Sequence, residues 1–324
     1  MKTRKLGRTG LDVSELIVGC GDVGGLMTRG DPADMRRAFR RALDAGVNWF
    51  DTAANYGKGV SEQSLGTLMK ETGARPHIST KVPIELSRLD DIPGQVEESA
   101  TASLKRLGLD RVDVLQLHNS LKPQSEGRFL GVDEVLKKNG VADALDRMRE
   151  KGLCRFVGFT ALGVTASCRR ALDSGRFDTV QVYYNLLNPS AARTMPKGWS
   201  GQDFARLLDG ARSHKMGVIA IRTLGAGIIA SDTRTGREFI MTEDTDVARE
   251  ERRTQAVFTA LGAGHGTRAQ AAMRFVLANP DVSGVNVGFA TDAQLAEALD
   301  AFAAGPLPAD AIARLEPVYA GSFA

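Results

Sequence analysis

The chain of 324 residues is poor in the features that mark several classes of protein. Its three cysteines, Cys20, Cys154 and Cys168, have no metal-binding spacing, and their odd number argues against a disulfide framework. It contains no apolar run of about 18 residues and no apolar signal core at the N-terminus. Its 42 Lys and Arg residues and 39 Asp and Glu residues are spread evenly. We therefore expect a reducing, cytoplasmic setting, no metal centre, and binding to neither membranes nor nucleic acid.

Short apolar runs alternate with longer helical patterns along the chain. One helix is predicted after the capping residue Asp31, with Pro32 in its first turn and Gly46 as its stop. Another is predicted over residues 201–215, and the polar segment 231–246 is expected to be a surface loop. Regular strand–helix alternation predicts a parallel sheet. The strand-like runs lie at 15–20, 47–51, 77–82, 111–118, 154–160, 178–184, 217–225 and 283–288.

Eight such units in a chain of this length favour a closed (β/α)₈ barrel, the TIM barrel, over an open doubly wound sheet. The Rossmann alternative would place a glycine-rich turn after the first strand. "GCGDVGG" at 19–25 has the spelling G-x-G-x-x-G, but no helix begins at its second glycine. Since no linker-like tract interrupts the chain, we predict a single domain over residues 1–324.

Polar residues at the carboxyl ends of three neighbouring strands are the first candidates for chemistry. Asp51, Lys81 and His118 end these strands, and Tyr56 lies in the loop after Asp51. Each has a structural alternative: Asp51 as a turn cap, Tyr56 as a surface aromatic, Lys81 as a snorkelling cation and His118 as a structural imidazole. Together they support proton transfer to a carbonyl, because a tyrosine hydroxyl can donate and a nearby ammonium stabilises its phenolate. Hydride must then come from a cofactor.

Several motifs resemble the aldo-keto reductases, in the same order along the chain. They are "FDTAANYGKGVSEQSLG", "STKV" and "DVLQLH", with "RKLGRTGLDVSELIVG" before them and "VQVYYNLLNP" after them, and the resemblance runs from residue 3 to about 303. It implies a (β/α)₈ barrel that uses NAD(P)(H) without a Rossmann domain. It also implies that Tyr56 is the general acid/base, with Asp51, Lys81 and His118 as its partners.

The resemblance also assigns residues to the cofactor. Thr160 and Gln181 match the partners of the carboxamide, while Ile221 stands where an aromatic usually stacks on the nicotinamide. Tyr183 or Tyr184 is an alternative for that stacking role. Arg222 is unusual, and two interpretations are open: it pairs with the pyrophosphate or with an acid at the barrel rim. Small residues at the pyrophosphate loop let backbone N–H groups approach phosphate. The further candidates for cofactor binding are Gly21, Leu224, Gly225, Gly227, Gly288, Phe289, Ala290, Thr291, Gln294 and Glu297.

The adenosine end of this pattern, "NVGFATDAQLAEAL" at 286–299, has no Lys or Arg. NADP-preferring members usually place a cation in this turn to meet the 2′-phosphate, and Asp292 would oppose that group. Losing such a contact removes about 1.5–3 kcal/mol. We therefore predict that NAD(H) is preferred and that NADP(H) is the alternative, unless a cation reaches in from another loop.

Substrate contacts are expected in the loops at the barrel rim. The candidates are Asp22, Asn119, Phe129 and Trp199, and plain loop packing is the alternative for each. The first functional interpretation is an NAD-dependent aldose 1-dehydrogenase or related alcohol dehydrogenase, as in relatives that oxidise sugars. The second is an NADPH-dependent aldehyde/ketone reductase, and a remote third is a cofactor-binding regulatory subunit. The sequence says little about oligomeric state.

Overall fold

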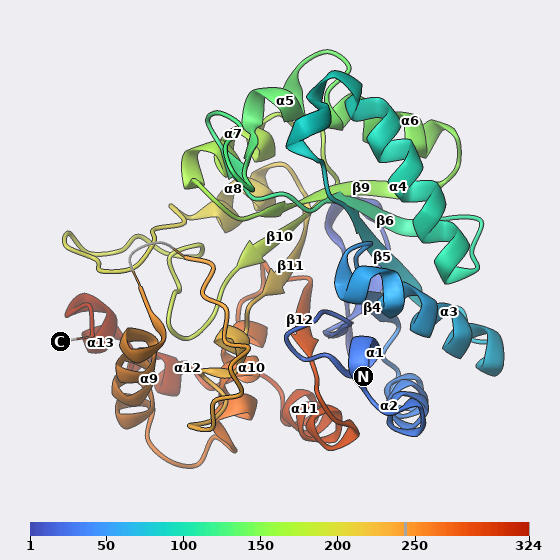
Figure 1. Ribbon diagram of the computed structural model, residues 1–324. Helices are drawn as coiled ribbons and strands as arrows, with labels where there is room; N and C mark the ends of the chain where they lie inside the picture. Colours follow the sequence, from blue (N-terminus) through green and yellow to red (C-terminus); the bar gives the residue numbers. More distant parts are fainter. Residues whose placement is uncertain (243–244, 324) are drawn as a thin grey trace.

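A closed barrel of eight parallel strands forms the centre of the protein (Figure 1), which confirms the predicted fold class. The computed structural model describes residues 1–242 and 245–323. The extent of the predicted domain, 1–324, stays a prediction, and residue 324 lies outside the described residues. Around the barrel, the strands are β10 (Thr179–Tyr183), β11 (Gly217–Ile221), β12 (Gly284–Gly288), β3 (Leu16–Gly19), β4 (Trp49–Asp51), β5 (His77–Val82), β6 (Val112–Leu117) and β9 (Cys154–Ala161).

Helices surround the barrel on its outside (Figure 1). Their apolar faces pack on the strands, while Asp31 caps the first long helix by accepting from two backbone N–H groups. The long helices are α2 (Pro32–Asp44), α3 (Val60–Thr72), α4 (Ile92–Leu107), α6 (Val141–Glu150), α7 (Thr165–Asp173), α8 (Leu207–Ser213), α9 (Val247–Leu261), α10 (Arg268–Leu277) and α11 (Asp292–Ala304). Shorter helices are α1 (Leu26–Arg29), α5 (Val132–Leu136), α12 (Ala309–Ala313) and α13 (Glu316–Ala320).

An N-terminal hairpin closes the amino end of the barrel. Strands β1 (Thr3–Lys5) and β2 (Asp12–Ser14) pair antiparallel around the 3₁₀ turn η1 (Gly7–Thr9). Gly7, at φ 48°, lies so close to β11 that a Cβ there would be 2.2 Å from the Gly217 nitrogen. The hairpin thereby fills the bottom of the barrel with a separate apolar cluster of Leu6, Leu11, Val13, Ile17, Trp49, Val114 and Ile219.

The opposite, carboxyl end carries the irregular segments. They include the 3₁₀ turns η2 (Tyr56–Gly59), η3 (Leu86–Asp91) and η4 (Gly225–Gly227), and the short pair β7 (Leu121–Lys122) and β8 (Leu130–Gly131). The predicted loop 231–246 belongs to this end, and its positions 243 and 244 lie outside the described residues. Long connections at this end leave room for a site at the carboxyl ends of the strands.

The helix predicted over 201–215 is shorter than expected. Regular helix starts only at Leu207, because Ala205 and Arg206 adopt left-handed φ values of 46° and 55°. Tertiary hydrogen bonds hold the preceding residues instead: the Gln202 side chain donates to the Gly163 carbonyl, and the Phe204 N–H donates to the Ser190 hydroxyl. Long-range polar contacts therefore override the local helical pattern.

Candidate functional site

Tyr56, Lys81 and Asp51 form one hydrogen-bonded chain at the carboxyl end of the barrel. Lys81 Nζ donates to Asp51 Oδ2 at 2.6 Å, to the Thr52 carbonyl at 2.7 Å and to the Tyr56 hydroxyl at 3.4 Å. The His118 ring meets the Tyr56 ring edge-on, with their centroids 5.5 Å apart. The structure thus brings together the four residues that the sequence singles out.

Asp51 is the acceptor at the centre of a wider network inside the barrel. Its Oδ1 accepts from Ser79 Oγ at 2.6 Å, Gln181 Nε2 at 2.8 Å and Gln116 Nε2 at 3.3 Å. Its Oδ2 accepts from Lys81 and from Asn286 Nδ2 at 2.8 Å. Five donors therefore fix the orientation of a carboxylate that is only 2% exposed.

Asn286 and Gln116 are members of this network that the sequence interpretation missed. Each is a polar residue inside an otherwise apolar strand, in "SGVNVG" and "DVLQLH". Strand side chains alternate in direction. A polar residue in such a strand therefore either points into the barrel or interrupts the run of apolar side chains that pack on the helices. That signal could have placed both of them beside Asp51.

A second buried ion pair holds the helix that follows Tyr56. Glu62 on α3 is fully buried, accepts from the Thr80 hydroxyl next to Lys81, and pairs with Arg106 Nε of α4 at 2.7 Å. Ser61 bonds Thr52 Oγ1 at 2.7 Å and donates to the Cys20 carbonyl at 2.9 Å. These contacts tie α3 to β3, β4 and β5, and so fix the loop that carries Tyr56.

Burial controls the protonation of the site. It raises the pKa of Tyr56, against the opposing effect of the Lys81 ammonium, so the phenol is protonated at neutral pH. For Lys81, burial acts to lower the pKa, but the Asp51 carboxylate and Tyr56 outweigh it and raise that pKa, so the ammonium stays charged. Burial followed by the charge of Lys81 lowers the pKa of His118 to about 3, and its ring is neutral.

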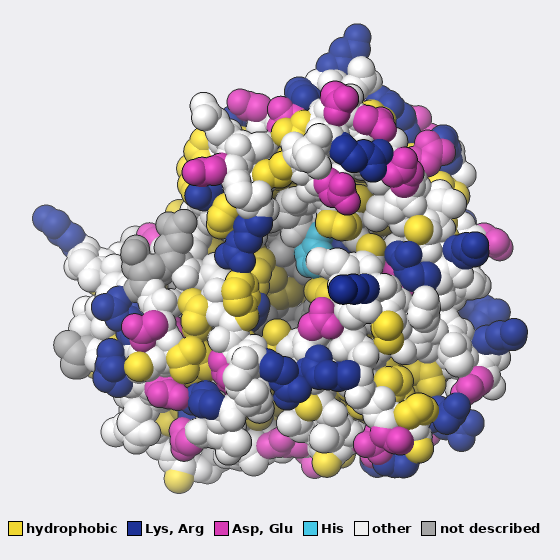
Figure 2. All heavy atoms as spheres, in the orientation of Figure 1, with side chains coloured by type: hydrophobic (Ala, Val, Ile, Leu, Met, Phe, Trp, Pro, Cys, Tyr) yellow, Lys and Arg dark blue, Asp and Glu magenta, His cyan; other side chains and the backbone are white. Residues whose placement is uncertain are grey.

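A cavity of about 500 Å³ opens above this chain of residues. Figure 2 shows a hollow on this face, with a histidine at its floor and Lys and Arg side chains along its rim. Asp51, Tyr56 and His118 line the cavity, while Lys81 lies beneath it, 1% exposed. The predicted cofactor residues that line the cavity are Gly21, Thr160, Gln181, Ile221, Arg222, Leu224, Gly227, Gly288, Phe289, Ala290, Gln294 and Glu297.

Two predicted cofactor residues lie outside the described cavity lining. Gly225 is inside the turn η4, between Leu224 and Gly227 at φ 54°, and Thr291 caps α11 by accepting from the Gln294 N–H. Gln181, in contrast, faces the cavity while its amide nitrogen is already engaged with Asp51. Its free amide oxygen is the part that remains for a ligand.

The cavity contains buried polar atoms without partners, as a cofactor site requires. The hydroxyls of Thr160 and Thr223, 3% and 1% exposed, line the cavity and have no hydrogen-bond partner among the described residues. His118 Nδ1 is also unpartnered among them. Such groups are costly to bury, and a polar ligand would satisfy them. The residues present therefore fit a nicotinamide cofactor, with Thr160 and Gln181 available to its carboxamide.

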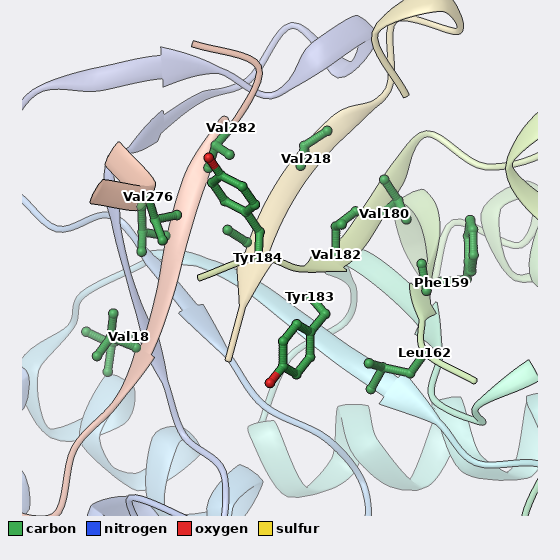
Figure 3. Packing of buried hydrophobic residues seen from close by; sticks show 14 of the residues in the cluster. Val18, Phe159, Leu162, Val180, Val182, Tyr183, Tyr184, Val218, Val276 and Val282 are labelled. Atoms are coloured by element: carbon green, nitrogen blue, oxygen red, sulfur yellow. The ribbon is translucent and has the colours of Figure 1, made fainter. Parts of the chain in front are cut away.

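The two tyrosines considered for stacking on the nicotinamide do not line the described cavity. In Figure 3 their hydroxyl groups point in opposite directions from β10 and the residue after it. Tyr183 stacks on Phe204 with centroids 5.2 Å apart, and Tyr184 stacks on Phe275 at 5.5 Å. Ile221 lines the cavity, so aliphatic packing is the contact that this chain offers there.

The adenosine corner differs from expectation in the role of Asp292. Its carboxylate does not line the described cavity, and it is held by Arg41 of α2 through two hydrogen bonds of 2.8 and 2.9 Å. The repulsion expected from a free Asp292 charge is therefore reduced. Two cations from outside this turn line the same cavity, Arg222 and Arg237, the latter from the segment 231–246. Gln294 and Glu297 line it too, bonded to the Ala290 N–H and the Thr267 hydroxyl.

Of the four substrate candidates, the structure places only Asp22 in the described cavity lining, where its Oδ1 accepts from the Gly57 N–H. Asn119 is occupied by two hydrogen bonds with the Ile84 backbone. Phe129 packs under Lys122, whose Nζ lies 4.4 Å from the ring centroid. Trp199 packs on Phe323, with centroids 5.4 Å apart. These three side chains serve loop packing.

Among residues 1–242 and 245–323, no group of three or more His, Cys, Asp or Glu residues is arranged to hold a metal ion. Within the same residues, no helix has the length and apolar character needed to cross a membrane.

Known proteins similar to this chain include two sugar dehydrogenases. L-galactose dehydrogenase of Arabidopsis thaliana is 26% identical over 303 residues, which cover 92% of this chain and 86% of the relative. D-threo-aldose 1-dehydrogenase of a Pseudomonas species is 27% identical over 70% of this chain and 71% of the relative.

One solved structure, an aldo-keto reductase from Bacillus halodurans in its holo form, has the same fold. It is similar with a TM-score of 0.74 at 20% identity, covering 98% of this chain and 96% of that one. The family model described as "Aldo/keto reductase family" matches residues 15–320. The protein therefore belongs to the aldo/keto reductase family of NAD(P)-dependent oxidoreductases.

Proposed function

We propose that the protein is an NAD-dependent aldose 1-dehydrogenase or a related alcohol dehydrogenase. The observation that carries the proposal is the Tyr56–Lys81–Asp51 chain, with Lys81 and Asp51 buried, at the floor of a cavity whose adenosine-side turn, Phe289–Asp292, contains no cation. The two sugar dehydrogenases among the relatives support the substrate class. The three buried free cysteines suit the reducing, cytoplasmic setting that we also propose.

Each residue of the site has a role that its geometry supports. In oxidation, Tyr56 takes the proton of the substrate hydroxyl, and in reduction it returns that proton to the carbonyl oxygen. Lys81 stabilises the phenolate at 3.4 Å, and Asp51 keeps the ammonium charged and oriented. The neutral His118 donates one ring N–H to the substrate oxygen and positions it. When bound, NAD⁺ or NADP⁺ supplies the hydride acceptor.

An NADPH-dependent aldehyde/ketone reductase is the second candidate, and specific contacts favour it. Arg41 neutralises Asp292, and Arg237 lines the cavity, so a 2′-phosphate would meet less repulsion than the turn alone implies. The two candidates share the catalytic chain and differ in cofactor and direction.

Cofactor affinity together with a substrate panel separates these candidates. We expect NAD⁺ to bind at least about tenfold more tightly than NADP⁺, because the turn lacks a charge-assisted contact for the 2′-phosphate. Calorimetric titration with each cofactor measures the ratio. A panel of aldoses and simple alcohols, followed by the absorbance of reduced cofactor, then measures oxidation. Tighter binding of NADP⁺ would reject the NAD assignment. If Arg237→Gln then lost the preference for NADP⁺, Arg237 would be the cation responsible for it.

The pH dependence should report Tyr56 and not His118. Reduction needs the protonated phenol, so its kcat/KM should stay level near neutral pH and fall only as the pH rises through the Tyr56 pKa, which burial raises above about 10. Oxidation needs the phenolate, so its kcat/KM should rise with pH. No inflection is expected between about pH 5.5 and 7.5, because the pKa of His118 is lowered to about 3. A clear inflection in that interval would contradict these assignments.

A further inference from the structure

Arg222 lines the cavity, and its guanidinium has no carboxylate partner among the described residues. Arg222 directly follows β11 and adopts a left-handed φ of 61°, which is uncommon for a residue with a long side chain. Its Nη1 donates to the Phe239 carbonyl at 2.8 Å, and no carboxylate of the described residues forms an ion pair with it. Since a guanidinium has five N–H donors, most of them remain available to a ligand.

The acids around the cavity are already engaged. Asp22 accepts from the Gly57 N–H, Glu238 from the N–H and hydroxyl of Thr235, and Glu297 from the Thr267 hydroxyl. Asp51 faces Lys81. Burial lowers the pKa of Arg222, as expected for a cation in a poorly solvated place. A half-buried cation of this kind is stabilised by an anion that enters the cavity.

Arg222 and Tyr56 line the same cavity. The positive charge of Arg222 acts to lower the pKa of Tyr56 and of Tyr183, against the larger effect of burial, which raises both pKa values. The hydrogen bond of Arg222 leads to Phe239, whose ring lies 5.1 Å from the Arg128 guanidinium in the segment between β6 and β9. A substrate with its oxygen on Tyr56 would share the cavity with the Arg222 side chain.

The adjacent Thr223 adds a second donor. Its hydroxyl is 1% exposed, lines the same cavity and has no hydrogen-bond partner among the described residues. A carboxylate offers two oxygens, which suits one guanidinium and one hydroxyl in neighbouring positions.

We propose that Arg222 and Thr223 bind a carboxylate on the substrate. The substrate class is then an aldehyde or alcohol that also carries a carboxylate, such as a uronic acid among the sugars. The inference rests on the proposed oxidoreductase function. It concerns the substrate anion alone, because the carboxylate takes no part in the transfer of hydride or proton.

Two aldehydes that differ in one carboxylate test the proposal: 4-carboxybenzaldehyde and benzaldehyde. In the wild type, we expect kcat/KM to be about tenfold or more higher for the charged aldehyde. Arg222→Gln should remove that advantage, so that the kcat/KM values for the two aldehydes come within about threefold of each other. Arg222→Lys should retain part of the advantage, because it keeps the charge. Lys122→Gln, which removes a cation outside the described cavity lining, should retain all of it.

Binding of benzoate to the complex with oxidised cofactor gives a readout that needs no turnover. Calorimetry should show binding to the wild type and about tenfold weaker binding to Arg222→Gln. If Arg222→Gln instead weakens NADH binding and slows both aldehydes equally, Arg222 serves the cofactor phosphates and the proposal is wrong. If benzoate binds both proteins equally, it is also wrong. The wild type could prove inactive toward both aldehydes while benzoate binds the wild type and not Arg222→Gln. That result would reject the proposed function and retain the anion site.

Discussion

Tyr56→Phe should abolish turnover while leaving the cofactor bound. The substitution removes one hydroxyl that lies 3.4 Å from Lys81 Nζ and keeps the ring that packs against His118. General acid/base catalysis by a positioned side chain contributes about 100-fold to 10,000-fold, so kcat should fall by that factor in both directions. Steady-state kinetics with an aldehyde and NADH, beside titration of NADH binding, measures the two quantities separately.

Tyr319→Phe is the matched control for this substitution. Tyr319 is also buried and donates its hydroxyl to the Leu186 carbonyl at 2.9 Å, but it does not line the described cavity. It should lower stability slightly and leave kcat within about twofold, because a typical hydrogen bond contributes about 1 kcal/mol to folding. An equal loss of kcat in both variants would mean that Tyr56 acts through structure and not through its proton.

Lys81→Met should be the most destabilising single change in the site. It leaves the buried Asp51 carboxylate with only neutral donors, and removing one partner of a buried pair costs about 3–5 kcal/mol. It should also lower kcat by about 100-fold, because the Tyr56 phenolate loses its cation. Urea unfolding measures the first effect, and kinetics the second.

A double-mutant cycle identifies the origin of that loss. Asp51→Asn alone leaves the Lys81 ammonium buried without its counter-ion, whereas Lys81→Met/Asp51→Asn has no buried charge in this pair. The double variant should therefore be more stable than the sum of the single losses predicts, by about 1–3 kcal/mol. Strict additivity would contradict a coupled pair.

An exposed ion pair provides the control for the same chemical change. Lys5 pairs with Asp12 at 2.8 Å on the surface of the N-terminal hairpin, with both side chains more than half exposed. Lys5→Met should change the free energy of unfolding by less than about 1 kcal/mol, because solvent screens the pair.

The barrel is predictable from sequence because its periodic signals are local. The strand at 77–82 is found with the predicted bounds, and the helix predicted after Asp31 begins at Pro32 with Asp31 as its cap. The helix predicted from residue 201 fails because the left-handed Ala205 and Arg206 serve tertiary contacts that no local pattern reveals. The hairpin beneath the barrel is missed for a related reason: its three-residue strands are too short for an alternating pattern to identify.

The site is predictable where motifs place residues at strand ends, and less so where distant helices contribute. The proximity of Asp51, Lys81 and His118 is predicted because the carboxyl ends of the parallel strands lie at one end of the barrel. Asp292 of α11 pairs with Arg41 of α2, which lies 251 positions away in the sequence. The sequence of the turn alone therefore overestimates the negative charge at the adenosine corner. The lack of a carboxylate partner for Arg222 among the described residues likewise depends on how the surrounding loops fold.

The central claim is that Tyr56 supplies the proton in a reaction whose hydride comes from a bound nicotinamide. Rapid mixing of an aldehyde with preformed NADH complexes of the wild type and of Tyr56→Phe tests it most directly, through the absorbance of the reduced cofactor. We predict that both proteins bind NADH equally and that the variant oxidises it at least about 100-fold more slowly. Oxidation of bound NADH by Tyr56→Phe at the wild-type rate would contradict the account.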